Sequence, residues 1–143
     1  MPHAVFDSTV LVSAFLAPKG VSAQLLSQAR RGAFTLWSSE VILTETEQTL
    51  LYSPHIRNRY EYPDQKVLDF TQGLRSLARL VTNLPNVKGV SRDPNDDMVI
   101  ACALAARALY LVTRDRDLLT LDTYQGVRMI SPEEFMGILR ERR

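Results

Sequence analysis

Two aspartates stand at the ends of short apolar stretches that predict buried strands. "HAVFDS" predicts a strand that closes on Asp7, and "LYLVTRD" predicts a strand that ends at Asp115. In an open parallel sheet the carboxyl ends of the strands meet at one edge, where ligands bind. Either carboxylate alone is explained by a turn, whereas the same feature at two strand ends indicates a shared acidic site.

A third group of carboxylates lies in the stretch "RDPNDDM". Asp93 followed by Pro94 is typical of a helix start, because aspartate caps free backbone N–H groups and proline is favoured at the first helical position. Asp96 and Asp97 would lie in the first turn, where each contact with the helix dipole contributes only about 0.3 to 1 kcal/mol. Successive helical residues point about 100° apart, so at most one of the two can be a principal ligand.

A fourth group lies in "SEVILTETEQTLLYS", a predicted helix with Ser39 as its N-cap. Glu40 is explained by its place in the first turn, next to the positive end of the helix dipole. Glu45 and Glu47 both lie near apolar positions, which is unusual for solvated carboxylates. Helical periodicity alone does not choose between these two.

The elements that must position these residues alternate between strands and helices. This alternation predicts an α/β fold with three layers, in which helices cover a mostly parallel sheet of four or five strands. The fifth strand would lie in the connection "LPNVKGVSRD". The other expected elements are helices in "VLVSAFLA", in "VSAQLLSQARRG", from 63 to about 83, from 94 to about 108 and after Ser131, and strands in "FTLWSS" and "VRMIS".

The composition indicates one domain, residues 1–143, which at 45% hydrophobic content can bury a substantial core. The formal net charge of +1 gives no overall attraction to a polyanion, so contacts with nucleic acid must come from local patches. The single cysteine, Cys102, excludes a disulfide framework. No basic leader and no apolar stretch of about 20 residues is visible, so we expect a soluble, cytoplasmic protein without a membrane span.

Three motifs in order resemble the PIN domain family: "FDSTVLVSAFL", "SSEVILTETEQTLL" and "DPNDDMVIACALAARALYLVTRDRDLL". The resemblance covers nearly the whole chain, and the last motif is the most specific. It points to the branch described as toxin components of toxin-antitoxin systems. It implies a compact α/β/α fold, a metal-dependent endoribonuclease that cleaves RNA, assembly as a homodimer, and an antitoxin protein as a partner.

The resemblance also implies four acidic site residues. The spacing of Ser39, Glu45 and Leu50 matches the family pattern, so the family's glutamate corresponds to Glu45. The full set is Asp7, Glu45, Asp96 and Asp115.

Neighbouring residues are expected to support this set. Thr113 supplies a hydroxyl group near the last aspartate, and Asp93 and Asp117 act in capping and support. Thr9 stands where the family often has asparagine, and a threonine can still hydrogen-bond a carboxylate. Asp97 is expected in solvent or in a supporting position.

Clustered carboxylates suit hydrolysis of a phosphodiester with Mg²⁺ or Mn²⁺, hard cations that take oxygen ligands. We expect Asp7 and Asp96 to be the main ligands. Asp115 and Glu45 would bind through water, complete a second metal site or orient the attacking water. Without metal the carboxylates repel one another, so the pKa of one or more should be raised.

Substrate contacts are expected from arginines. Arg114 and Arg116 flank Asp115, where they could contact phosphates. Arg57 and Arg59 lie with tyrosines in "RNRYEY", a mixture suited to phosphate contact and base stacking, although an exposed turn with packed tyrosines explains it as well.

Two other functional classes need residues that this sequence lacks. A phosphatase of the haloacid dehalogenase type needs a second aspartate where Thr9 stands, and a phosphorylation-receiver module needs a lysine at a late strand end, where Lys19, Lys66 and Lys88 do not lie. The remaining alternative is a PIN-like module that binds RNA or a protein with weak catalysis. Metal-dependent cleavage of single-stranded RNA distinguishes it from a nuclease.

Overall fold

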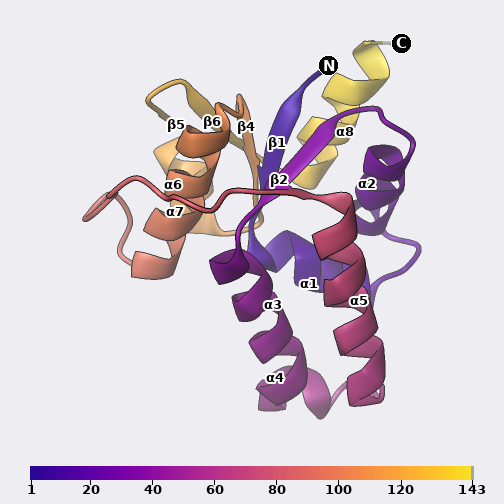
Figure 1. Ribbon diagram of the computed structural model, residues 1–143. Helices are drawn as coiled ribbons and strands as arrows, with labels where there is room; N and C mark the ends of the chain where they lie inside the picture. Colours follow the sequence, from indigo (N-terminus) through magenta and orange to yellow (C-terminus); the bar gives the residue numbers. More distant parts are fainter. Residues whose placement is uncertain (143) are drawn as a thin grey trace.

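The computed structural model describes residues 1–142, so Arg143, the last residue of the expected domain, lies outside the described residues. Residues 1–142 form a six-stranded sheet flanked by helices (Figure 1). The strand order is β3-β2-β1-β4-β6-β5, and neighbours are parallel except for β5 and β6. The strands are β1 His3–Phe6, β2 Thr35–Ser38, β3 Arg79–Leu80, β4 Tyr110–Val112, β5 Thr123–Tyr124 and β6 Val127–Ile130.

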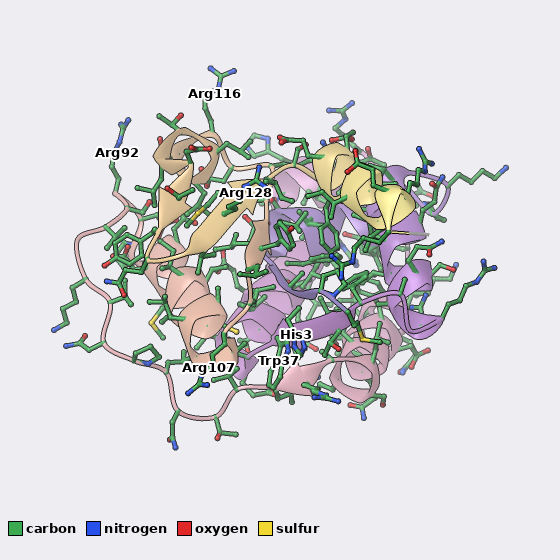
Figure 2. All side chains as sticks on the ribbon, turned by 90° about the horizontal axis from the view of Figure 1, so that it is seen from above. His3, Trp37, Arg92, Arg107, Arg116 and Arg128 are labelled. Atoms are coloured by element: carbon green, nitrogen blue, oxygen red, sulfur yellow. The ribbon has the colours of Figure 1, made fainter. Side chains whose placement is uncertain are left out.

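Helices cover both faces of this sheet, which confirms the predicted three-layer α/β fold. They are α1 Ser8–Leu16, α2 Val21–Arg30, α3 Glu40–Tyr52, α4 Pro54–Arg57, α5 Asp64–Leu77, α6 Pro94–Ala106, α7 Arg116–Leu121 and α8 Pro132–Glu141. Helix α6 packs on β1, β2 and β4, whereas α2 and α8 pack together over the other face (Figure 2). Among residues 1–142 no single helix is long and apolar enough to cross a membrane. Within these residues, only α1 and α2 taken together have the length and composition of a membrane span, and the two helices are bent by 100° relative to one another.

An aromatic cluster joins α8 to the sheet. Phe6 of β1 lies 5.6 Å from Phe34 and 6.1 Å from Phe135, measured between ring centroids. Phe34 and Phe135 are 4.9 Å apart and T-shaped, and all three rings are buried. Aromatic pairs in such geometries contribute about 0.5–1.5 kcal/mol beyond their buried area. The cluster therefore holds the amino end of α8 against β1.

Capping residues mark the helix starts as the sequence predicts. Ser39, Asp93 and Ser131 each precede a helix and accept a hydrogen bond from a backbone N–H of its first turn. These bonds satisfy donors that a helix leaves without partners at its start. Helices α3, α6 and α8 therefore begin where local sequence signals place them.

Two expectations about the elements were wrong. The helix predicted from 63 to about 83 ends at Leu77, because Arg79 and Leu80 pair with β2 as strand β3 instead. The sheet of residues 1–142 has six strands rather than four or five, since β3 and β5 are two residues long and too short for a periodic pattern. Strand β3 also lies before the connection 84–93 and not within it.

We expect Phe135→Ala to lower the free energy of unfolding by about 3–5 kcal/mol, because it empties the aromatic cluster. Leu109→Ala, at a 59% exposed position, should change it by less than about 0.5 kcal/mol. Urea unfolding followed by circular dichroism measures both. Equal effects of the two substitutions would contradict the packing of Phe135 against Phe6 and Phe34.

Candidate active site

Asp7 lies at the carboxyl end of β1 and caps the start of α1. Its backbone N–H donates to the carbonyl of Val112 at 3.1 Å, and the residue is only 2% exposed. Its Oδ1 accepts hydrogen bonds from the Thr9 hydroxyl at 2.6 Å and the Val10 N–H at 3.2 Å. Its Oδ2 accepts a hydrogen bond from the Thr113 hydroxyl. The sheet thus presents a buried carboxylate whose two oxygens are both held.

Thr9 and Thr113 connect this carboxylate to the loop after β4. The Thr9 hydroxyl accepts from the backbone N–H of Arg114 at 3.2 Å, and the Thr113 hydroxyl accepts from the N–H of Asp115 at 2.9 Å. Each threonine therefore gives its one proton to Asp7 and accepts one from the loop. Thr9 makes this contact although the family often has asparagine at its position.

Glu45 and Glu47 point to different neighbours, which distinguishes them as periodicity could not. Glu45 Oε1 accepts a hydrogen bond from the Ser8 hydroxyl at 3.1 Å, next to Asp7. Glu47 Oε1 accepts a hydrogen bond at 2.8 Å from the hydroxyl of Thr71 on α5. Glu45 faces the carboxyl edge of the sheet, whereas Glu47 belongs to the packing of α3 on α5.

The first turn of α6 brings Asp96 to this edge. Asp93 accepts a hydrogen bond from the backbone N–H of Asn95 at 2.9 Å and so starts the helix. Asp96 is 8% exposed, and its Oδ2 accepts a hydrogen bond from the Ser91 hydroxyl at 3.1 Å. The cap therefore sets the direction in which the Asp96 side chain leaves the helix.

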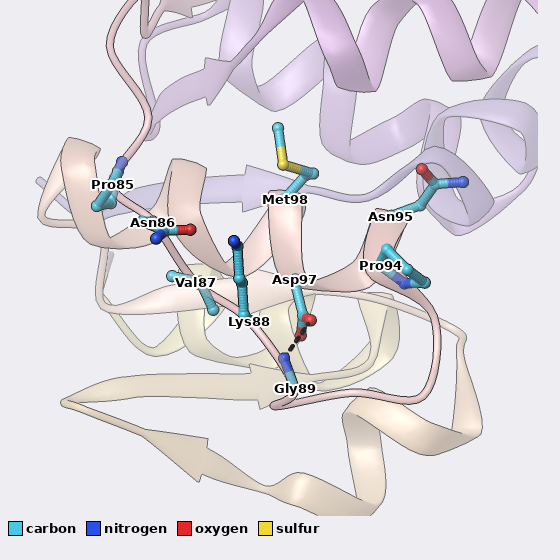
Figure 3. A pocket seen from close by; sticks show the side chains of 9 residues that line it. All are labelled: Pro85, Asn86, Val87, Lys88, Gly89, Pro94, Asn95, Asp97 and Met98. Atoms are coloured by element: carbon cyan, nitrogen blue, oxygen red, sulfur yellow. Dashed lines mark hydrogen bonds between the residues drawn. The ribbon is translucent and has the colours of Figure 1, made fainter.

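Asp97 is buried, at 5% exposure, so its expected placement in solvent was wrong and its supporting placement is the one observed. Its two oxygens accept the backbone N–H groups of Gly89, at 3.0 Å, and Ser91, at 2.8 Å. The first of these bonds is drawn in Figure 3. Asp97 points about 100° away from Asp96 around the helix and fastens the preceding loop to α6.

Asp115 follows β4 and caps α7. Its Oδ1 accepts a hydrogen bond from the backbone N–H of Asp117 at 2.8 Å. Asp117 is exposed, and its Oδ1 lies 3.6 Å from a guanidinium nitrogen of Arg92. An exposed pair at this distance contributes at most about 1 kcal/mol, so Asp117 adds little to the site beyond the helix start.

The pKa of Asp7 is raised to about 6, and burial is the largest cause. The hydroxyl groups of Thr113 and Thr9 lower that pKa, because hydrogen bonds to the oxygens favour the charged form. The charge of Asp115 raises it. Asp7 and Asp115, which are far apart in the sequence, therefore lie near enough to repel one another.

Repulsion is stronger at Asp96. Burial, the largest cause, and the charges of Asp115, Asp93 and Asp7 together raise the pKa of Asp96 to about 7, against the lowering effect of the Ser91 hydrogen bond. Burial also raises the pKa of Glu45, with a contribution from the charge of Asp93. The expectation that some of these carboxyls would have raised pKa values is confirmed.

A comparison with known families agrees with this arrangement. Residues 3–117 match the family model described as PIN domain. The chain belongs to the PIN domain family. An uncharacterized protein of Methanocaldococcus jannaschii, MJ1680, is 28% identical over 118 residues, which is 82% of this chain and 73% of that protein.

Two solved structures share the PIN domain fold. PAE2754 from Pyrobaculum aerophilum superposes with a TM-score of 0.64 at 15% identity and covers 98% of this chain and 90% of its own. VapBC2 from Rickettsia felis, solved with a DNA fragment from its promoter, has a TM-score of 0.57 at 15% identity. The match covers 89% of this chain and 96% of that chain. PIN domains are typically nucleases and generally bind divalent metal ions.

The acidic residues of this PIN domain offer the oxygen ligands that a divalent cation prefers, but their side chains lie apart from one another. Among residues 1–142, no three His, Cys, Asp or Glu side chains are grouped closely enough to hold one ion. Mg²⁺ requires less than that, since it commonly binds through one or two carboxylates and keeps several waters. Asp96 makes a single side-chain hydrogen bond, from Ser91, and Asp7 accepts one bond at Oδ2, so each carboxylate keeps an acceptor position for such an ion.

The two arginines beside Asp115 differ in whether their side chains are held by other residues. Arg114 donates two hydrogen bonds to the carboxylate of Glu133 on α8, at 2.8 and 3.2 Å, so its side chain is held there. Arg116 is exposed and extends outward from α7 (Figure 2). Of this pair, Arg116 is the one available for a phosphate.

The "RNRYEY" segment has a packing role. Arg57 pairs with Asp64 at 2.8 Å, and its guanidinium lies 4.5 Å from the centroid of the Tyr62 ring. The Tyr62 hydroxyl donates to the carbonyl of Leu50 at 2.7 Å. Arg59 is exposed just after α4, beyond the end of α3. The packed-turn interpretation therefore explains this segment, and substrate contact by Arg57 and Arg59 stays a prediction.

Sequence reasoning missed three residues around the carboxylates. Ser8 and Ser91 donate hydrogen bonds to Glu45 and Asp96. Asn95 lines a groove of about 470 Å³ beside Glu45, together with Glu40, Val41 and Thr44. Serine and asparagine are common in turns and caps, so their sequence signal is weak. The Ser8 contact spans 37 residues, which no local pattern reveals.

We expect Asp97→Ala to lower the free energy of unfolding by about 2–3 kcal/mol, because it removes two hydrogen bonds from backbone N–H groups to a buried, charged acceptor. Hydrogen exchange at Gly89 and Ser91 should become faster. Asp69→Ala on the exposed face of α5 is the control and should leave exchange in the loop unchanged. Unaltered protection of Gly89 and Ser91 in Asp97→Ala would show that the loop is held by other contacts.

Metal-free protein should lose stability as the pH rises from about 4 to 7. The pKa of Asp96 is about 7 in the folded protein against 3.8 ordinarily, so the folded state binds the proton more tightly and this advantage disappears as the proton leaves. Asp96→Asn should therefore be more stable than the wild type by about 2–4 kcal/mol at pH 8 and similar at pH 4. Urea unfolding in EDTA across this range measures the difference, and a pH-independent difference would contradict it.

Proposed function

We propose that this PIN domain is a Mg²⁺- or Mn²⁺-dependent endoribonuclease and the toxin component of a toxin-antitoxin system. The observation that carries the proposal is that buried Asp7 and Asp96 lie with Asp115 at the carboxyl edge of one mostly parallel sheet, where the charge of Asp115 raises the pKa of both. Buried like charges lower stability, and groups with perturbed pKa values cluster at functional sites. Ion binding at this edge would relieve the repulsion.

Asp7 and Asp96 would hold the ion, with Asp115 and Glu45 acting through water. When bound, a divalent ion lowers the pKa of a water molecule and neutralises charge on phosphoryl oxygens. Mg²⁺ and Mn²⁺ accept the same oxygen ligands. A second ion between Asp115 and Glu45 is compatible with the same set.

The side chains of this protein orient the reacting groups. Thr9, Thr113 and the Val10 N–H occupy three acceptor positions of Asp7, so the position that remains, on Oδ2, points in a set direction. Ser8 holds one oxygen of Glu45. The raised pKa of Glu45 makes this carboxylate a stronger base than an ordinary glutamate. A stronger base is better suited to accept a proton from an attacking water.

A single RNA strand is the substrate that suits the surroundings of the site. The groove beside Glu45 is open to a chain, and Arg116 beyond Asp115 can contact a phosphate on the other side. Glu40 at the groove is paired with Arg75 at 2.8 Å, which reduces its repulsion of a phosphate. Single strands with unstacked bases can follow such a path.

Two protein partners complete the proposal. An antitoxin would bind and restrain the nuclease, and the fold shared with VapBC2 of Rickettsia felis supports this assignment only by analogy. A second copy of this chain would form a homodimer. Co-expression with a small DNA-binding protein encoded nearby, followed by light scattering, tests both partners.

Asp7→Asn and Asp96→Asn should each reduce Mn²⁺-dependent cleavage of a labelled single-stranded RNA by at least about 100-fold. Glu45→Gln should also reduce it strongly. The matched control is Glu47→Gln on the same helix, which contacts Thr71 and should retain activity within a few fold.

Full activity in Asp7→Asn or Asp96→Asn would refute the roles given to these residues. Wild-type protein that binds RNA without cleaving it under Mn²⁺ would instead indicate a PIN domain acting as a binding module. A thermal shift on adding Mn²⁺, present in the wild type and reduced in Asp96→Asn, reports metal binding independently of cleavage.

A further inference from the structure

The connection between β3 and α6 folds back along α6 and forms one wall of a pocket of about 420 Å³ (Figure 3). The other wall is the first part of α6. This volume lies within the range of about 300–1,000 Å³ found for small-molecule sites. We name it the loop pocket, and its lining includes Pro85, Asn86, Val87, Lys88, Asn95 and Met98.

The loop pocket adjoins the candidate active site. Asn95 lines both this pocket and the groove beside Glu45. It also directly precedes Asp96 in the first turn of α6. A strand whose phosphodiester lies between Glu45 and Asp96 can therefore place a neighbouring base beside Asn95.

The loop wall is held in place before any ligand binds. The Asp97 carboxylate accepts the N–H groups of Gly89 and Ser91. Gly89 has a φ of 71°, a conformation that glycine adopts without strain. A preformed wall lowers the ordering cost of binding, because the loop does not have to be immobilised by the ligand.

The chemistry of the loop pocket suits a nucleobase. Asn86 and Asn95, whose amides have donors and an acceptor, both line the pocket, with Asn86 on the loop and Asn95 at the start of α6 (Figure 3). Lys88 extends between them from the loop in the direction of α6. Apolar surface for the faces of a ring comes from Pro85, Val87 and Met98. Flat, uncharged rings with polar edges match this combination.

We propose that the loop pocket holds the base next to the cleaved phosphodiester of a single-stranded RNA and prefers guanine there. This inference rests on the proposed function and adds its sequence preference. The Lys88 ammonium can donate to O6 and N7 of guanine, whereas adenine carries an amino group in place of O6. Lys88 is thus the specificity-determining residue, and Asn86 on the same loop reads the remaining edge.

Cleavage of short RNAs that differ only at the nucleotides flanking the cleaved bond measures this preference. Wild-type protein should show a kcat/KM about tenfold higher for guanine than for adenine at one flanking position. Lys88→Ala should bring that ratio close to one, and the control Lys66→Ala, exposed on α5, should leave it unchanged. A wild-type ratio near one, or an unchanged ratio in Lys88→Ala, overturns the proposal.

A second measurement does not depend on cleavage. An RNA carrying 6-thioguanosine at the same position, irradiated with the protein in EDTA, should crosslink to residues 85–98. Asn86→Trp fills the loop pocket and should abolish the crosslink, whereas Asn83→Trp, exposed outside the pocket on the same connection, should retain it. Crosslinks confined to other segments overturn the proposal.

The two measurements also separate this inference from the proposed function. A crosslink in the loop pocket without any cleavage supports the base site and contradicts the nuclease. Cleavage with no base preference and no crosslink supports the nuclease and overturns the base site. If the loop pocket binds a protein segment instead of a base, neither the guanine preference nor the crosslink appears. That outcome also overturns the proposal.

Discussion

The burial of one carboxylate, Asp7, determines how the site is built. A charge at the end of β1 is costly in apolar surroundings unless hydrogen bonds satisfy it. Thr9 and Thr113 supply those bonds, and each also accepts a backbone N–H from the loop after β4. The contacts that make burial of Asp7 tolerable are therefore the ones that join two strand ends. The raised pKa, about 6, shows that they compensate for burial only in part.

The first turn of α6 separates three acidic residues by direction. Asp93 caps the helix, Asp96 faces the other carboxylates and Asp97 faces the loop. Their separation follows from the rotation of about 100° per residue in a helix. The turn therefore connects the proposed metal site to the loop pocket, and a shift of α6 would move both together. Such a link is how a nuclease with one cleavage site could couple cutting to recognition of a neighbouring base.

Much of the fold could be predicted because its signals are local. Ser39, Asp93 and Ser131 mark helix starts, since a cap acts on the N–H groups of the next few residues. The end of α5 at Leu77 could not be predicted, because it depends on pairing of β3 with β2, about forty residues earlier in the chain. Strand β3 was missed for the same reason, whereas β5 pairs locally with β6 and was missed because two residues are too few for a periodic pattern.

By itself, the sequence determined the alternation of strands and helices, the caps and the placement of Asp7 directly after β1, whereas β4 ends at Val112 and Asp115 caps α7 rather than closing the strand. It also placed Asp96 and Asp97 in one turn, because residues adjacent in the sequence stay adjacent along a helix. Only the tertiary structure decided that Glu45 meets Ser8 while Glu47 meets Thr71, and that Asp97 is buried beneath the loop. These contacts depend on which element packs against which, and packing is set by the whole chain and not by neighbours in sequence.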